Sequence, residues 1–186
     1  PVGSARWRRR TQRLLRESGA RYRQALPLRI LKGFTRRDLR NHRKLYLIDG
    51  RIGWIGSQNI VAPDFRPGIV NRELLVRAEG PLATQMQCQF EVDWHMESRE
   101  PAPVPPAPAP DAGDAAAQLL PSGPDYAVEG FQSLLVWQLH RARRRAIIVT
   151  PYFIPDADIL SAMRSAVLRG VEVHLLVSRV MDQPLV

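Results

Sequence analysis

A histidine and a lysine two residues apart form the part of this sequence best suited to chemistry. His42 and Lys44 lie in the extended run NHRKLYLI. Successive side chains of a strand point to opposite faces, so these two are expected on one face, with Tyr46 and Ile48 continuing it. An imidazole is a nucleophile near neutral pH, and an ammonium group is a compact positive charge. The spacing therefore predicts a nucleophile beside a fixed cation.

The residues that follow predict that the chain folds back on itself. Asp49 and Gly50 separate two apolar runs, and an Asp-Gly pair is the strongest short signal for a hairpin because glycine accepts a positive φ. The return run, RIGWIG, leads into Ser57 and Asn59. We therefore expect Ser57 and Asn59 to lie near His42.

This spacing resembles the HKD signature of the phospholipase D superfamily. The pattern is His-x-Lys-x4-Asp, followed after six residues by Gly-Ser-x-Asn, and it contains no gap. The flanking stretches TRRDLRNHRK, GSQNIVAPDF, RELLVRAEGPLATQMQCQFEVDW and TPYFIPDADILSAMRSAVLRGVEVHLLV resemble those of bacterial cardiolipin synthases. The resemblance covers most of the chain apart from a proline-rich connector. It implies an α/β fold, a phospholipase D-like mixed sheet flanked by helices, in an incomplete arrangement of two pseudo-duplicated halves.

The resemblance also implies a role for each motif residue in phosphodiester exchange. His42 is expected to attack phosphorus, and Lys44 to hold a non-bridging oxygen without help from a metal. Ser57 and Asn59 are expected to donate hydrogen bonds to the same phosphate. Glu73 matches the acidic residue that the family uses to anchor the second nitrogen of the histidine. No metal and no cofactor is expected.

Three other motif residues are expected to have structural roles. Asp49 lies on the face opposite to His42 by strand parity, so we assign it to the turn rather than to catalysis. Gly50 and Gly56 belong to the same structural motif.

The charge of the chain points to an anionic partner. The 186 residues carry a net charge of +9, but residues 1–51 hold 16 Lys and Arg and three Asp and Glu, net +13, and the remainder is net −4. A basic block of this kind suits lipid head groups, a membrane surface or a nucleic-acid backbone. The single cysteine, Cys88, excludes an internal disulfide.

Composition divides the chain into three parts. Residues 101–124 begin with PAPVPPAPAP and predict an extended linker, because proline fixes φ and lacks an amide donor. Residues 1–100 are then the C-terminal part of a first phospholipase D-like half. Residues 125–186 predict a helix, strand, helix and strand, the beginning of a second half without its own HKD motif.

Two helices and a loop are expected around the motif. Residues 5–24 predict a basic helix, for which packing on a sheet is favoured over a lipid surface. Residues 61–71 contain two prolines and a glycine and predict a loop at the mouth of the site. Residues 82–97 predict a helix with an apolar core-facing stripe, formed by Leu82, Met86, Phe90 and Trp94.

The resemblance favours a cardiolipin synthase-like phosphatidyltransferase. Such an enzyme transfers a phosphatidyl group between phosphatidylglycerol molecules through a phosphohistidine, and releases cardiolipin and glycerol. The superfamily pairs two HKD units, so the missing second half or a second copy is an expected partner, and the fragment itself is expected to be inactive. The alternatives are a phospholipase D-type phosphodiesterase or metal-independent nuclease of the same superfamily, and a non-catalytic module that binds anionic surfaces.

The expected partners are anionic phospholipids, namely phosphatidylglycerol and cardiolipin, together with a membrane surface; nucleic acid is not favoured. No apolar run is long enough to span a bilayer. The expected location is the bacterial cell membrane, where the protein is peripheral or anchored by segments upstream of Pro1.

Overall fold

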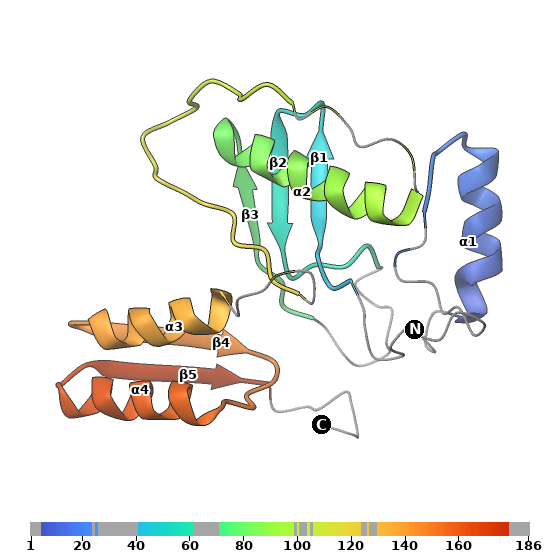
Figure 1. Ribbon diagram of the computed structural model, residues 1–186. Coiled ribbons are helices and arrows are strands. Elements are labelled where there is room, and N and C mark those ends of the chain that lie inside the picture. The colour runs from blue at the N-terminus through green and yellow to red at the C-terminus, as the bar shows by residue number, and fades with distance from the viewer. Residues whose placement is uncertain are drawn as a thin grey trace. The chain divides into compact units, whose positions relative to one another are not determined.

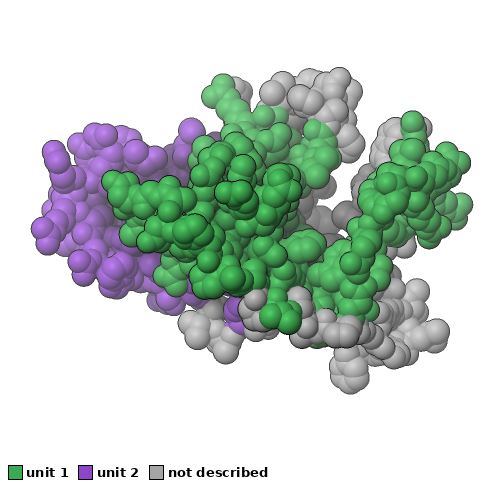
Figure 2. Space-filling view, turned by 90° about the horizontal axis from the view of Figure 1, so that it is seen from above, with its two compact units in different colours: residues 1–119 green, residues 120–186 purple. Residues whose placement is uncertain are grey.

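The computed structural model describes residues 5–23, 25, 41–61, 71–98, 100, 104, 106–123, 126 and 130–178, except for the side chains of residues 5–8. The chain forms two compact units, residues 1–119 and residues 120–186, which Figure 2 shows in green and purple. The division falls inside the segment 101–124 that the sequence assigns to a linker. The assignment of the units to two phospholipase D-like halves stays a prediction.

The first unit contains an antiparallel sheet of three strands, in the order β1 (Leu45–Ile48), β2 (Ile52–Gly56) and β3 (Leu75–Ala78). The turn between β1 and β2 has a positive φ at Asp49 (55°) and at Gly50 (64°), and the Arg51 amide donates to the Ile48 carbonyl at 3.0 Å. A pair of positive φ values matches the right-handed twist of the strands on either side. The predicted hairpin is therefore confirmed.

Helix α2 (Pro81–Ser98) covers one face of this sheet, lying across β1 and β2 (Figure 1). It begins with a proline, which is suited to the first helical position, directly after Gly80 with φ 68°. Met86 is fully buried, and the space that a side chain at Gly53 of β2 would need is filled by its sulfur. The predicted helix is confirmed, although Phe90 of its expected core stripe is half exposed.

Helix α1 (Ala5–Glu17) differs from the expectation. Six of its thirteen residues are arginines, and Leu14 is 52% exposed. The helix that packs on β1 and β2 is α2. Among the described side chains of α1, Gln12 and Leu15 are half-buried and the others are exposed. The apolar stripe of α1 is too narrow to bury a face, which leaves its basic side chains in solvent.

The described part of the connector, including 106–123, contains no helix or strand (Figure 1). It is tied to α2 at two points. The Ala109 amide donates to Thr84 Oγ1 at 3.1 Å, and the Leu119 amide donates to Gln85 Oε1 at 2.9 Å. The extended chain thus satisfies part of its backbone on the first unit. Most of the loop expected at 61–71 lies outside the described residues.

The second unit is a helix, strand, helix, strand succession, as the sequence predicts. Its elements are α3 (Gly130–Arg141), β4 (Arg145–Thr150), α4 (Ala157–Leu168) and β5 (Glu172–Val177). Strands β4 and β5 are parallel, and α4 joins them. The side chain of Asp156 caps α4 by accepting from the Ile159 amide at 2.8 Å. The protein is therefore of the α/β class, with one small sheet in each unit.

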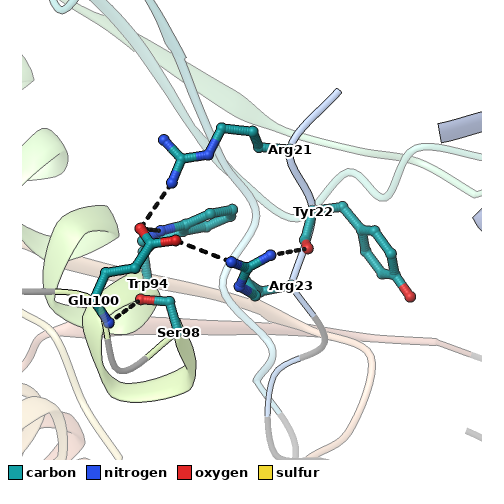
Figure 3. A network of polar contacts seen from close by, with 6 residues as sticks. All are labelled: Arg21, Tyr22, Arg23, Trp94, Ser98 and Glu100. Carbon is teal, nitrogen blue, oxygen red and sulfur yellow. Dashed lines mark hydrogen bonds and ion pairs between the residues drawn. The ribbon is translucent and has the colours of Figure 1, made fainter. Parts of the chain in front are cut away.

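A network around Glu100 ties the segment after α1 to the end of α2 (Figure 3). Glu100 accepts from Arg21 Nη2 at 2.7 Å, from Arg23 Nη2 at 2.9 Å and from Trp94 Nε1 at 3.0 Å. Both guanidinium groups also lie over the indole ring, 5.4 and 5.3 Å from its centroid. The hydrogen bonds from Trp94 and then Arg21 hold the pKa of Glu100 below its usual range.

This shift predicts a pH dependence of stability. A carboxyl whose pKa is lower in the folded state adds stability above its unfolded pKa, about 4.3, and loses that stability as the pH falls through the folded pKa. We expect Glu100→Gln to unfold at a slightly lower temperature than the wild type at pH 7, and the difference to vanish well below pH 4. Thermal melts monitored by circular dichroism test this, and a difference that stays constant from pH 7 to pH 3 would contradict it.

Candidate active site

His42 and Lys44 lie side by side at the start of β1. The Lys44 ammonium nitrogen is 3.4 Å from His42 Nδ1 and donates to the His42 carbonyl at 2.7 Å. The Gly56 amide donates to the Lys44 carbonyl at 3.4 Å, so Lys44 continues the ladder between β1 and β2. The shared face expected from strand alternation is therefore observed.

Ser57 and Glu73 lie at the same edge of the sheet. In an antiparallel sheet, the start of β1, the end of β2 and the start of β3 meet at one edge. Ser57 Oγ donates to Glu73 Oε2 at 2.5 Å and accepts from the Leu74 amide at 3.0 Å, while the Ser57 amide donates to the Leu74 carbonyl at 3.1 Å. Ser57 thereby joins β2 to the residues that lead into β3.

The partner of Glu73 differs from the one that the family resemblance implies. Within the described part of the chain, the carboxylate of Glu73 is bonded to Ser57, and the imidazole of His42 is in contact with Lys44. Among these residues no hydrogen bond or ion pair joins His42 to Glu73. An anchoring role of Glu73 toward His42 therefore stays a prediction.

An open depression of about 430 Å³ lies beside the predicted phosphate ligand Asn59. Tyr46 forms part of its wall, two residues beyond Lys44, and its hydroxyl donates to the Gln58 carbonyl at 2.8 Å. Ile60 is 87% exposed there and Val61 is 43% exposed. The full lining is Tyr46, Gln58, Asn59, Ile60, Val61 and Leu75. The polar residues Gln58 and Asn59 thus lie next to an apolar wall in this depression.

The remaining motif residues occupy structural positions. Asp49 and Gly50 form the turn at the end of β1 that is opposite to Lys44. Gly56 faces β3 so closely that a Cβ there would collide with the Leu74 carbonyl oxygen and lie 2.9 Å from Leu75 Cα. A glycine at this position therefore lets β2 and β3 approach next to Ser57.

Behind the histidine and lysine lies a set of contacts that the sequence reasoning missed. Asn41 Nδ2 donates to Asp93 of α2 at 3.2 Å, and Arg43 Nη1 lies 3.0 Å from both oxygens of the same carboxylate. These contacts could have been predicted from the alternation of side chains along the strand, because it places the polar residues Asn41 and Arg43 on the face that α2 covers. Polar groups at such positions require partners.

No group of three or more His, Cys, Asp or Glu side chains within the described residues is arranged to hold a metal ion. Lys44 is the cation beside His42 in this structure.

Comparison with known proteins assigns the family. The family model described as "Cardiolipin synthase, PLD-like domain" matches residues 2–94 and 135–186. Cardiolipin synthase A of Pectobacterium carotovorum subsp. carotovorum is 37% identical over 183 residues, which is 93% of this chain and 38% of that protein. Cardiolipin synthase A of Proteus mirabilis is 35% identical over 182 residues, 92% of this chain and 37% of that protein.

The chain therefore belongs to the phospholipase D-like domain family of cardiolipin synthases. It spans less than two fifths of the length of these curated relatives.

The close approach at Gly56 predicts a large effect of a small substitution. In Gly56→Ala the added methyl group meets backbone atoms of β3, which cannot move aside without separating the strands. We expect a loss of about 1 to 3 kcal/mol in the free energy of unfolding, measured by urea denaturation. Gly130→Ala is the matched control, because its Cβ would meet only Leu120 at 3.4 Å. Equal stability of the two variants would contradict the explanation.

Proposed function

We propose that the protein containing this chain is a phosphatidyltransferase that makes cardiolipin and glycerol from two molecules of phosphatidylglycerol. The observation that carries the proposal is the His42 and Lys44 pair, 3.4 Å apart at a sheet edge shared with Ser57. The family membership and the similarity to cardiolipin synthase A support it. This chain, with one His-x-Lys unit, is expected to be inactive alone.

The proposed reaction proceeds through two displacements at phosphorus. In the first, an imidazole nitrogen bonds to the phosphorus of phosphatidylglycerol while the bond from phosphorus to the glycerol oxygen breaks, and a general acid protonates the departing glycerol. In the second, a hydroxyl of another phosphatidylglycerol attacks the phosphohistidine and loses its proton to a base. The bond from nitrogen to phosphorus breaks, so cardiolipin forms and the imidazole is restored.

The residues of this chain would divide these tasks. His42 is one of the two histidines that the reaction needs, as nucleophile or as general acid. Lys44 would neutralise a phosphoryl oxygen, and Ser57 and Asn59 would donate hydrogen bonds to it. In the structure Glu73 accepts the hydrogen bond of the Ser57 hydroxyl. Because this hydroxyl has a single proton, it would turn from Glu73 to donate to the phosphoryl oxygen when substrate binds. The second histidine would come from a further half of the protein or from a second copy.

The wall beside Asn59 favours a lipid over a nucleic acid as the substrate. A phosphate bound by Lys44 and Asn59 would place one ester substituent over Tyr46, Ile60 and Val61. These side chains offer an apolar surface suited to the glycerol ester and first methylene groups of a lipid. A nucleotide would instead place a charged, hydrated backbone over the same surface.

The exposed basic side chains of α1 support association with an anionic bacterial membrane. The arginines of α1 with described side chains, Arg9, Arg10, Arg13 and Arg16, all lie in solvent. Each basic residue near an anionic surface is worth about 1 kcal/mol of binding. None of the described helices combines the length and apolar character needed to cross a bilayer.

A nuclease-like phosphodiesterase is the second candidate, because the same exposed arginines also suit a phosphate backbone. Cleavage of DNA without added metal by the complete protein, with no turnover of phospholipid, would select this function instead.

The main prediction concerns cardiolipin in cells. Lipid extracts of a cardiolipin-deficient bacterium that expresses the full-length protein should contain cardiolipin, and His42→Ala should abolish it. His140→Ala is the matched control, because His140 is an exposed histidine of α3 that belongs to no His-x-Lys pattern, and its loss should leave cardiolipin unchanged. Cardiolipin that persists at the wild-type level in His42→Ala would refute the proposed role of this histidine.

A second prediction concerns the apolar wall. Ile60→Ser removes apolar surface where a lipid would lie, so we expect KM for phosphatidylglycerol in mixed micelles to rise about tenfold with kcat little changed. Leu168→Ser, a substitution at an equally exposed leucine of α4, is the control and should leave KM unchanged. The same KM for both variants would show that the wall does not contact the substrate.

A further inference from the structure

One carboxylate of α2 holds the backbone that carries the catalytic pair. Asp93 accepts from Asn41 Nδ2 at 3.2 Å and from Arg43 Nη1 at 3.0 Å to each oxygen. Gln89, one helical turn earlier and buried, donates to Asp93 Oδ1 at 3.0 Å. Both carboxylate oxygens are therefore bonded, and the side chains of Arg43 and Asp93 are only 24% and 26% exposed.

These contacts bracket His42 on both sides. Asn41 and Arg43 are its neighbours in the chain, and both side chains reach Asp93. In addition, the Arg43 amide donates to Asn41 Oδ1 at 3.0 Å, which closes a local turn around His42. The ammonium group of Lys44 fixes the same peptide from the other face through the His42 carbonyl.

The helix that carries Asp93 is itself held on the sheet. Met86, two turns before Asp93 on α2, is fully buried against Gly53 of β2. Leu45, Arg43 and Asn41 line the same hollow of about 370 Å³ as Asp93. Odd-numbered residues of this stretch thus face α2, while His42 and Lys44 face the site.

We propose that Asp93 is a positioning residue for the reaction, acting through Asn41 and Arg43 on the placement of His42 and Lys44. This inference rests on the proposed function of the histidine and lysine pair. Transfer between bound groups requires their alignment within a fraction of an ångström, and a misplacement of about 1 Å costs on the order of 100-fold in rate. A carboxylate with a fixed helix behind it supplies that alignment from outside the substrate site.

The test is Asp93→Asn in the full-length protein. An amide keeps the size of the side chain but turns one acceptor oxygen into an NH2 donor, which would face the donors of Asn41 or Arg43. We expect kcat for phosphatidylglycerol to fall about 10- to 100-fold with KM within about twofold of the wild type. Asp93→Glu, which keeps the charge, should recover part of the loss.

Glu91→Gln is the matched control. Glu91 is a carboxylate on the same helix, but it accepts from Gln87 rather than from the stretch that carries His42. Its kcat should stay within about threefold of the wild type. Rates are expressed per folded molecule, with the folded fraction measured by circular dichroism, so that a purely structural role of Asp93 would lower the yield and not the rate.

A second variant covers the case in which Asp93→Asn does not fold. Asn41→Ala removes the exposed side chain that links Asp93 to the Arg43 amide, and should lower kcat about tenfold. The inference is overturned if the folded variants turn over at the rate of Glu91→Gln, or if KM rises while kcat is kept. If His42→Ala is active, the proposed function is wrong and this inference is wrong with it. If His42→Ala is inactive while Asp93→Asn is fully active, only this inference is wrong.

Discussion

Strand alternation across six residues is the constraint on which the site depends. Between Asn41 and Tyr46 the chain presents His42 and Lys44 to one face and Asn41, Arg43 and Leu45 to the other. In the proposed reaction the first face would supply a nucleophile and a cation for a phosphate, whereas the second face supplies an attachment to α2. A shift of one residue would exchange the two faces, so the contacts with α2 and the reactive groups are specified together.

The antiparallel sheet brings the other polar groups to the same edge. Because β2 returns beside β1 through a short turn, Ser57 lies at the same edge of the sheet as Lys44. Glu73, which precedes β3, lies at this edge as well. Gly56 permits the close approach of β2 and β3 at that point. The site is therefore built from backbone pairing, with side chains contributed by three neighbouring strand ends.

Much of this arrangement could be predicted from sequence because the signals are local. The Asp49-Gly50 turn, the existence of helix α2 and the crossover unit around α4 each depend on residues close in the chain. Contacts between distant residues gave no such signal. The hydrogen bond from Ser57 to Glu73 depends on the register in which β2 pairs with β3. The hydrogen bonds from Asn41 and Arg43 to Asp93 join residues about fifty positions apart in the chain. The packing on a sheet that was expected of residues 5–24 does not bury Leu14, which is 52% exposed, because six arginines leave α1 too little apolar surface.

We propose that His42 and Lys44 together bind the phosphoryl group of the substrate. A crystal structure of the full-length protein soaked with tungstate, a tetrahedral mimic of phosphate, tests it most directly. We expect an anion within hydrogen-bond distance of the Lys44 ammonium group and the His42 imidazole, with Ser57 or Asn59 as a further donor, and no anion there in Lys44→Ala. Tungstate bound elsewhere, or bound equally well without the lysine, would show that His42 and Lys44 do not form the phosphate site.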